Sequence, residues 1–278
     1  MTMWTQDDFR RLCPGGLIGM IHLRALPGSP AWGGSLAAVG EAALADADNL
    51  VAGGAGALML ENYHDVPFYP DGVPPVTIAA MTELAGAVRR RHPGVSLGIN
   101  VLRNDAGAAL AVAAVTGARF IRVNVHVGAA ATDQGPLTGA AWRTLRLRRE
   151  LGADVGILAD VRVKHARPLV ERPLAEEAQD LRLRGLADAV IVTGAATGSG
   201  TDPAEVAAVR AALPGCPVLV GSGVTALSVG RFVPAADGFI VGSSLKEETA
   251  AAGSVISRDL TRRLVNALAQ ARGGKGAA

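Results

Sequence analysis

The chain has 278 residues, of which 49% are hydrophobic and 19% charged, and its formal net charge is +2. This length suits one α/β barrel, and the composition excludes a disordered or coiled-coil protein. We therefore predict one domain over residues 1–272, followed by a disordered tail at residues 273–278.

Charge and cysteine usage narrow the class of partner. The basic clusters at residues 89–91 and 143–149 have helical spacing and few aromatic neighbours, which is typical of solvated helix faces. Cys13 and Cys216 lack metal-ligand spacing, and without a signal peptide they indicate reduced thiols in the cytoplasm. Apolar runs such as residues 106–114 are too short to span a bilayer. We expect neither a nucleic-acid partner nor a membrane partner.

Eight apolar runs of strand length follow one another along the chain, and each leads into small or polar residues and then a helical pattern. They are residues 17–23, 57–62, 96–102, 120–126, 155–163, 189–193, 218–221 and 238–241. The clearest helices between and after them are residues 35–53, 174–184, 202–213 and 254–271. This alternation predicts an α/β fold, a single (β/α)8 TIM barrel. A doubly wound sheet is disfavoured, because no Gly-x-Gly-x-x-Gly opens a helix after the first strand.

The connections after the first two strands, residues 24–34 and 63–75, are longer than a barrel requires. The second of them is rich in proline and aromatic residues. Such loops are typical of substrate covers and subunit contacts, and we expect a homo-oligomer. The alternative is that the prolines only hold a surface loop in shape.

Two segments of small residues follow the last two strands, Gly-Ser-Gly-Val at 221–224 and Gly-Ser-Ser at 242–244. Small residues let backbone N–H groups close on a phosphate, and in a barrel the loops after strands 7 and 8 form such a site. The sequence therefore predicts a phosphorylated small-molecule substrate. The expected phosphate-binding residues are Gly221, Ser222, Gly223, Gly242 and Ser243. The alternative is that these glycines only turn the chain.

Polar side chains gather at the ends of the other strands. Because strand residues alternate between the barrel interior and the helix layer, the fourth strand directs Arg122, Asn124 and His126 inward. By the same alternation the fifth strand directs Asp160, Arg162 and Lys164 inward. The remaining polar residues at strand ends are His22, Glu61 or Asn62, Asn100, Arg103, Asn104 and Asp105.

This concentration lies at the end of the barrel where barrel enzymes react, and buried polar groups are costly unless they are paired. Structural alternatives remain for single residues. Arg122 and Asp160 could form an internal salt bridge that only completes the packing. His22 could be a core histidine, and Lys164 could be a surface charge beyond the end of its strand.

Several of these segments resemble the BtpA/SgcQ family. The matching segments are GMIHL (19–23), LPGSP (26–30), ENY (61–63), DVPF (65–68), GINVLRND (98–105), FIRVNV (120–125), TDQG (132–135), ADV (159–161), VKHA (163–166), IVTG (191–194) and GSGVT (221–225). The resemblance implies a barrel of the ribulose-phosphate-binding kind. Some members are described as photosystem I biogenesis factors, and the SgcQ branch as candidate nucleosidases. The chain departs from the family pattern at residues 69–71 and 242–244, and neither departure removes a candidate acid or base.

The main hypothesis is an enzyme that acts on a phosphorylated sugar, nucleoside or nucleotide and hydrolyses an N-glycosidic bond at the C-terminal mouth of the barrel. Such a reaction passes through an oxocarbenium-like state, which a carboxylate stabilises while an acid protonates the leaving base. The expected catalytic residues are Glu61, Asp160, His22 and Lys164. The expected substrate-binding residues are Asn100, Asn104, Arg122, Asn124 and Thr193.

Other hypotheses stay open. No cofactor is predicted, although the carboxylates could instead be oxygen ligands of an Mg²⁺ ion. A second enzyme hypothesis is a lyase or isomerase in which Lys164 forms a Schiff base with a sugar-phosphate carbonyl, its pKa lowered by Arg162. A hypothesis of a different class is a non-catalytic assembly factor that binds a protein partner through its long loops.

Overall fold

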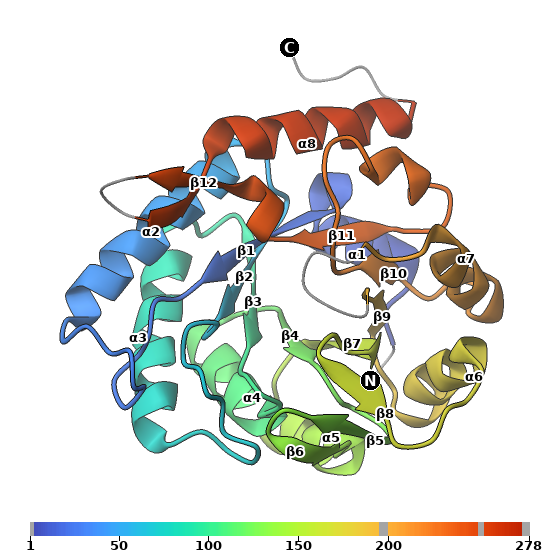
Figure 1. Ribbon diagram of the computed structural model, residues 1–278, viewed down its shortest axis with the longest axis horizontal. Coiled ribbons are helices and arrows are strands. Elements are labelled where there is room, and N and C mark those ends of the chain that lie inside the picture. Colours follow the sequence, from blue (N-terminus) through green and yellow to red (C-terminus); the bar gives the residue numbers. More distant parts are fainter. Residues whose placement is uncertain (1–2, 195–199, 250–252, 274–278) are drawn as a thin grey trace.

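The computed structural model describes residues 3–194, 200–249 and 253–273, and eight parallel strands form a closed barrel at its centre (Figure 1). Around the ring the order is β1, β11, β10, β9, β7, β4, β3 and β2. The strands are β1 (Leu17–His22), β2 (Ala57–Glu61), β3 (Ser96–Asn100), β4 (Phe120–Val123), β7 (Gly156–Arg162), β9 (Ala189–Val192), β10 (Val218–Val220) and β11 (Gly238–Val241). All eight predicted strands are present, and the predicted (β/α)8 barrel is confirmed.

Helices surround the barrel on the outside (Figure 1). They are α2 (Leu36–Ala52), α3 (Pro75–Arg91), α4 (Ala106–Thr116), α5 (Ala141–Glu150), α6 (Leu174–Gln179) with a π-helical turn at Asp180–Arg184, α7 (Pro203–Ala212) and α8 (Arg258–Ala271). The prediction that the last helix begins at residue 254 is wrong. The chain before it is extended in β13 (Gly253–Ile256), and Ser257 caps α8 by accepting a hydrogen bond from the Leu260 N–H. No described helix is both long and apolar enough to cross a membrane.

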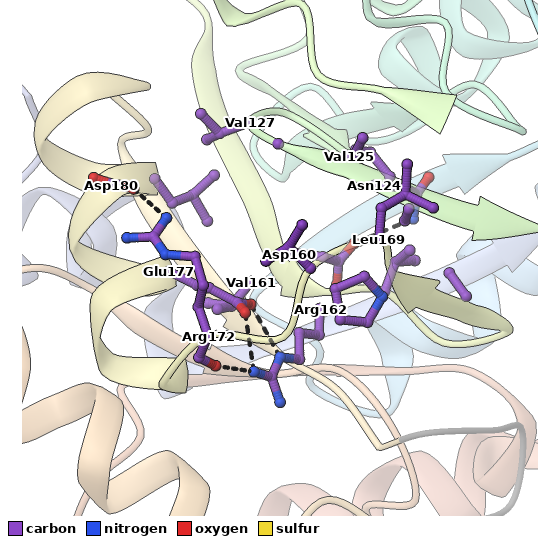
Figure 2. Close-up of a pocket in the computed structure, with 18 residues that line it drawn as sticks. Asn124, Val125, Val127, Asp160, Val161, Arg162, Leu169, Arg172, Glu177 and Asp180 are labelled. Carbon is purple, nitrogen blue, oxygen red and sulfur yellow. Dashed lines mark hydrogen bonds and ion pairs between the residues drawn. The ribbon is translucent and has the colours of Figure 1, made fainter. Parts of the chain in front are cut away.

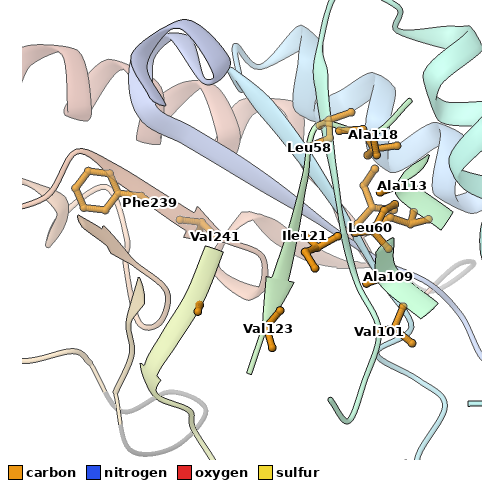
Figure 3. Packing of buried hydrophobic residues seen from close by; sticks show 14 of the residues in the cluster. Leu58, Leu60, Val101, Ala109, Ala113, Ala118, Ile121, Val123, Phe239 and Val241 are labelled. Atoms are coloured by element: carbon orange, nitrogen blue, oxygen red, sulfur yellow. The ribbon is translucent and has the colours of Figure 1, made fainter. Parts of the chain in front are cut away.

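The apolar side chains divide into two layers, as the strand alternation predicts. The outer layer packs between strands and helices, and Figure 3 shows Leu58, Leu60, Ile121 and Val123 beside the α4 alanines. The inner layer fills the barrel with residues such as Met20, Met59, Phe120, Leu158 and Ile191. The lower part of the barrel interior is therefore a packed apolar core.

The N-terminal helix α1 (Gln6–Leu12) closes the bottom of the barrel, and no pattern in the sequence predicted it. Phe9 is fully buried and belongs to the inner apolar cluster. Its ring occupies the space that a side chain at Gly238 would need, at 2.5 Å from an added Cβ, and the Trp4 ring does the same at Gly156, at 2.1 Å. Two strand glycines thus let α1 and Trp4 pack against the barrel.

Two small sheets, which the sequence did not predict, lie at the mouth of the barrel. One is antiparallel and joins β5 (Ala129–Thr132) to β6 (Gly135–Thr138) and β8 (Ala166–Pro168). The other is the hairpin of β12 (Lys246–Thr249) and β13, which follows the last barrel strand. Short 3₁₀ turns lie at Pro14–Gly16, Val229–Arg231 and Ser243–Leu245. Of the tail predicted at 273–278, Gly273 lies in a turn after α8, and residues 274–278 lie outside the described residues.

The two long connections after β1 and β2 are irregular, as expected. Asp65 joins them, because its Oδ1 accepts a hydrogen bond from the Leu26 N–H at 2.7 Å and its Oδ2 accepts one from Asn62 Nδ2 at 3.1 Å. Asn62 Oδ1 in turn accepts from the Leu102 N–H at 2.7 Å. The loops after the first three strands are therefore connected by buried or half-buried hydrogen bonds and can move independently only if these bonds break.

Candidate functional site

Glu61 ends β2 and lies in register between His22 of β1 and Asn100 of β3, so the three side chains face the mouth side by side. Asn100 Nδ2 donates to Glu61 Oε1 at 2.7 Å, and His22 Nε2 lies 3.6 Å from Glu61 Oε2. The side chains of Glu61 and His22 are 7% and 9% exposed. One carboxylate oxygen is thus hydrogen-bonded, and the other faces an imidazole beyond hydrogen-bond distance.

The His22 imidazole is neutral at pH 7 in this environment. Burial, followed by the charges of Lys246 and Lys164, holds its pKa well below the usual value of 6.5. The ring stacks on Tyr63, with centroids 4.4 Å apart. On its other side an added Cβ at Gly242 would come within 2.7 Å of His22 Cε1. His22 is therefore suited to contact and orient Glu61, and it is poorly suited to act as an acid.

Asp160 on β7 forms a closed arrangement with Arg122 of β4. Arg122 Nε and Nη2 donate to the two Asp160 oxygens at 3.0 and 2.9 Å, and Asn124 Nδ2 adds a third bond to Oδ2 at 3.1 Å. Burial opposes the charge of Arg122, yet the Asp160 carboxylate keeps the Arg122 pKa above its usual value. The Asp160 side chain is 0% exposed. The internal salt bridge that the sequence left as an alternative is present.

Two lysines approach Glu61 from different loops. Lys164 follows β7, and its pKa is lowered by burial and then by the charge of Arg122, while Glu61 and Asp160 oppose that shift. Lys246 begins β12, and its pKa is lowered by burial, while Asp46 and Glu61 oppose the shift. Lys246 was missed from the sequence, although it stands four residues after Gly242 of the predicted phosphate loop.

Two buried amide oxygens at the mouth lack a hydrogen-bond partner in the described part of the chain. They are Asn100 Oδ1 and Asn124 Oδ1, from residues that are 1% and 4% exposed. Each amide already donates through Nδ2 to a carboxylate, to Glu61 and Asp160 respectively. Unpaired buried acceptors are rare in native proteins because they are costly. These two are arranged to accept hydrogen bonds from a polar ligand.

The two predicted phosphate loops lie side by side, because β10 and β11 are neighbours. Ser244 Oγ donates to the Val224 carbonyl at 2.6 Å and ties one loop to the other. Gly223 has a φ of +65°, which favours glycine. Among the described residues, no hydrogen bond uses the N–H of Gly223 or Ser243.

The remaining members of these loops have packing roles as well. An added Cβ at Gly221 would lie 2.8 Å from Ile191 Cγ2 and 3.9 Å from Arg122 Nη2. The Ser222 carbonyl accepts a bond from Thr201 Oγ1 at 3.3 Å. Gly221 therefore leaves the room that the Ile191 and Thr193 side chains occupy, which is a steric reason for glycine at that position.

Two residues predicted to face the interior do not. Arg162 forms a bidentate ion pair with Glu177 of α6, because a register shift between Asp160 and Arg162 reverses the alternation of β7. His126 lies beyond the end of β4 at Val123, and its Nε2 bonds to the Gly185 carbonyl at 2.9 Å in the outer layer. The prediction that Arg162 lowers the pKa of Lys164 is therefore wrong. The charge of Arg122 lowers that pKa instead.

Two predicted substrate-binding residues bond to backbone groups. Asn104 Nδ2 donates to the Val125 carbonyl at 2.9 Å, and its Oδ1 accepts from the Val125 N–H at 2.8 Å, which fixes the loop after β4. Thr193 Oγ1 donates to the Arg162 carbonyl at 2.5 Å. Arg103, which is 6% exposed, donates through Nη2 to the Lys164 carbonyl at 2.8 Å. These four bonds hold the walls of the mouth.

Metal binding has no geometric support in the described residues, where no three His, Cys, Asp or Glu side chains are grouped as ligands. Both mouth carboxylates are instead bonded to amide or guanidinium groups. The Mg²⁺ alternative stays a prediction.

The fold and its polar mouth define a class, the (β/α)8 barrels with a site at the C-terminal ends of the strands. Within it, this chain belongs to the BtpA family, whose model matches residues 14–270. The predicted resemblance to that family is confirmed.

Curated relatives are similar over most of their length. The photosystem I biogenesis protein BtpA of Synechocystis is 47% identical over 83% of this chain and 80% of that protein. An uncharacterized protein of Thermococcus kodakarensis is 43% identical over 90% and 93%. An uncharacterized mitochondrial protein of Caenorhabditis elegans is 35% identical over 83% and 84%.

Solved structures resemble the fold at low sequence identity. Phosphoribosyl anthranilate isomerase from Thermus thermophilus has a TM-score of 0.57 and 14% identity, over 92% of this chain and 98% of that one. The 3-keto-L-gulonate-6-phosphate decarboxylase of Vibrio cholerae has a TM-score of 0.54 and 13% identity, over 97% and 99%. At these identities the likeness establishes the barrel fold.

Proposed function

We propose that this chain is an enzyme that hydrolyses the N-glycosidic bond of a small phosphorylated sugar derivative at the C-terminal mouth of the barrel. The observation that carries the proposal is the pair of unpartnered amide oxygens, Asn100 Oδ1 and Asn124 Oδ1. Both are buried acceptors in a strongly polar cluster, and sugar hydroxyls are donors of the right kind for them.

Charge supports a phosphorylated substrate. The cations Arg103, Arg122, Lys164 and Lys246 lie at the mouth beside Glu61 and Asp160, and Asp133 and Asp46 add negative charge near Arg103 and Lys246. A phosphate monoester carries nearly two negative charges at pH 7, and Lys164 and Lys246 form no ion pair within 4 Å among the described residues, so they are the cations left to bind it. The uncommitted N–H groups of Gly223 and Ser243 offer it hydrogen bonds. The isomerase and decarboxylase of similar fold are likewise named for phosphorylated substrates.

In this proposal Glu61 is the catalytic carboxylate. It accepts the proton of a water molecule whose oxygen attacks the anomeric carbon, and the ammonium of Lys164 gives a proton to the leaving nitrogen as the C–N bond breaks. His22 and Asn100 orient Glu61, and Asp160 orients Arg122 toward the substrate. The products are a free base and a sugar phosphate.

The test is a panel of matched nucleosides and nucleoside 5′-monophosphates, with free base measured by chromatography. We expect base release from monophosphates and much slower release from the nucleosides, because only the former carry the phosphate. Initial sugar product with inverted anomeric configuration, read by proton NMR, is expected for direct attack by water. Cleavage of the nucleosides alone would contradict the phosphate site, and no cleavage of any member would contradict the hydrolase.

One observation favours a second candidate, a lyase or isomerase that uses Lys164. This lysine is half-buried, its pKa is lowered, and no ion pair within 4 Å engages it among the described residues. A neutral amine can add to a sugar-phosphate carbonyl and expel water to form an imine. Borohydride would reduce that imine to a stable secondary amine, which mass spectrometry would locate on Lys164. A trapped adduct would favour this candidate, and its absence would favour hydrolysis.

The name of the Synechocystis relative favours a third candidate, a biogenesis factor without turnover. It predicts that no substrate class is consumed and that substitutions at Glu61 leave cellular function intact. A homo-oligomer and a cytoplasmic location belong to the proposal as expectations, which light scattering of the purified chain and cell fractionation would check.

A further inference from the structure

A cavity of about 430 Å³ opens beside the mouth, between the end of β7, the small β5–β6–β8 sheet and α6. Figure 2 shows Asn124 and Asp160 on one side of it and the Arg162–Glu177 and Arg172–Asp180 pairs on another. The cavity therefore reaches two members of the polar cluster. Its volume lies in the range of small-molecule pockets, roughly 300–1,000 Å³.

The walls of the cavity are mainly apolar. They are contributed by Val125, Val127, Ala129, Ala130, Val161, Val163, Ala166, Pro168, Leu169 and Val170. Leu169 and Val170 on its rim are 56% and 71% exposed, so part of the apolar wall faces solvent. Burying such surface against a ligand is favourable by about 25 cal/mol per Å².

Among the described residues, every charged side chain that lines the cavity has a partner of opposite charge. Arg162 pairs with Glu177 at 2.9 Å, and Arg172 pairs with Asp180 at 2.6 Å. Asp160 is neutralised by Arg122 at 2.9 Å. An anion or cation placed here would lose its hydration without gaining a counter-charge. Charge complementarity thus favours an uncharged occupant, whereas the mouth holds Lys164 and Lys246, which form no ion pair within 4 Å among the described residues.

We infer that this side cavity holds the uncharged aromatic ring of the substrate, a nitrogen heterocycle, while the sugar phosphate lies in the mouth. The inference rests on the proposed function, which requires a leaving base next to the polar cluster. Asn124 stands at the boundary of the two compartments, since it lines the cavity and bonds to Asp160. Its unpartnered Oδ1 is the acceptor that a ring N–H or a sugar hydroxyl at this boundary would use.

The experiment measures two probes separately on the full chain. Benzimidazole, an uncharged ring at neutral pH, is followed by saturation-transfer NMR, and ribose 5-phosphate is followed by calorimetry. We expect both to bind, and we expect benzimidazole to stay bound when ribose 5-phosphate is added. Leu169→Asp places a charge on the exposed rim, where the fold tolerates it, and should weaken benzimidazole about tenfold or more. Leu183→Asp, at a leucine 63% exposed and outside the cavity, is the matched control and should change it less than about twofold.

A second pair of variants adds bulk instead of charge. Ala166→Leu, in the cavity wall, should also weaken benzimidazole, whereas Ala131→Leu, on an exposed position of the neighbouring strand, should not. Equal ring binding in wild type and both cavity variants would overturn the inference, as would displacement of benzimidazole by ribose 5-phosphate. Ribose 5-phosphate binding without any ring binding overturns it and leaves the proposed function standing. Ring binding at the cavity without ribose 5-phosphate binding supports the cavity site and counts against the phosphate-dependent function.

Discussion

Glu61 and Asp160 are both buried carboxylates at the mouth, with side chains 7% and 0% exposed, yet their surroundings differ. Asp160 accepts three hydrogen bonds, two of which form its bidentate ion pair with Arg122, and they occupy both of its oxygens. Glu61 accepts one bond from Asn100, and its second oxygen faces His22 at 3.6 Å. Burial alone therefore does not identify a catalytic group. What distinguishes Glu61 is an oxygen that is still available to a water molecule or a substrate.

The largest effect on stability should come from breaking the buried ion pair between Asp160 and Arg122. Asp160→Asn leaves the buried Arg122 guanidinium without its counter-charge, and loss of one partner of a buried pair costs about 3–5 kcal/mol. Chemical denaturation would measure this fall in the free energy of unfolding. Asp154→Asn, at the exposed pair with Arg119, is the control and should cost less than about 1 kcal/mol. A stable Asp160→Asn protein with lost turnover would instead restore Asp160 as a catalytic residue.

The Glu61→Gln variant tests whether the carboxylate with an available oxygen is the catalytic one. The amide can still accept from Asn100, so the free energy of unfolding should change little, while turnover of the monophosphate substrate should fall about a hundredfold or more. Glu83→Gln, at a carboxylate 66% exposed on α3, is the matched control and should keep full turnover. If Glu61→Gln were fully active, the catalytic assignment of Glu61 would be wrong.

How much of the mouth the sequence predicts depends on how regular the backbone is. Inside the regular strands the alternation places Glu61, Asn100, Arg122 and Asp160 correctly. It fails for Arg162, because one register irregularity in β7 exchanges the two faces of the strand.

Beyond the ends of the strands, the alternation of side chains no longer predicts which way a residue faces. His126 was misplaced because β4 ends at Val123, three residues earlier. Lys246 was missed because its approach to Glu61 depends on the path of the β12–β13 hairpin. The small sheet escaped for a related reason: β5 reads Ala-Ala-Ala-Thr, and both β6 and β8 contain a proline, so neither has the composition of a strand.

Substitution of Gly242 should have a smaller effect on stability and turnover, because Gly242 packs against His22, which lies beside Glu61. In Gly242→Ala the added Cβ would lie 2.7 Å from His22 Cε1 and 3.1 Å from Met20 Cβ, so the imidazole must shift from its present position beside Glu61. Overpacking of this kind costs about 1–3 kcal/mol, and turnover should fall with stability. The double variant with His22→Ala should recover most of the stability and none of the turnover. Gly94→Ala, where an added Cβ meets nothing within 4 Å, is the control.

The last and smallest effect concerns the histidine that the alternation misplaced. His126 is 1% exposed, its Nε2 bonds to the Gly185 carbonyl, and its Nδ1 is buried without a partner in the described residues. Burial lowers the pKa of His126; the bond to Gly185 opposes the shift, and the charge of Arg148 adds to it while that of Asp188 opposes it. The folded protein therefore resists protonation at a site that binds a proton freely once the chain unfolds.

Because the unfolded chain binds the proton near pH 6.5 and the folded chain does so only at lower pH, the contribution of His126 to stability is complete above pH 6.5 and is lost as the pH falls below it. The loss approaches about 1.4 kcal/mol per pH unit for each histidine that stays neutral in the fold. His22 and His64 have lowered pKa values too, so the dependence of wild-type stability on pH is the sum of contributions from His22, His64 and His126. His126→Gln, whose amide can still donate to Gly185, should remove one share of that slope between about pH 5 and 6.5, with unfolding curves in urea as the measurement. An unchanged slope would mean that a proton enters the folded state at Nδ1 as easily as it enters the unfolded chain.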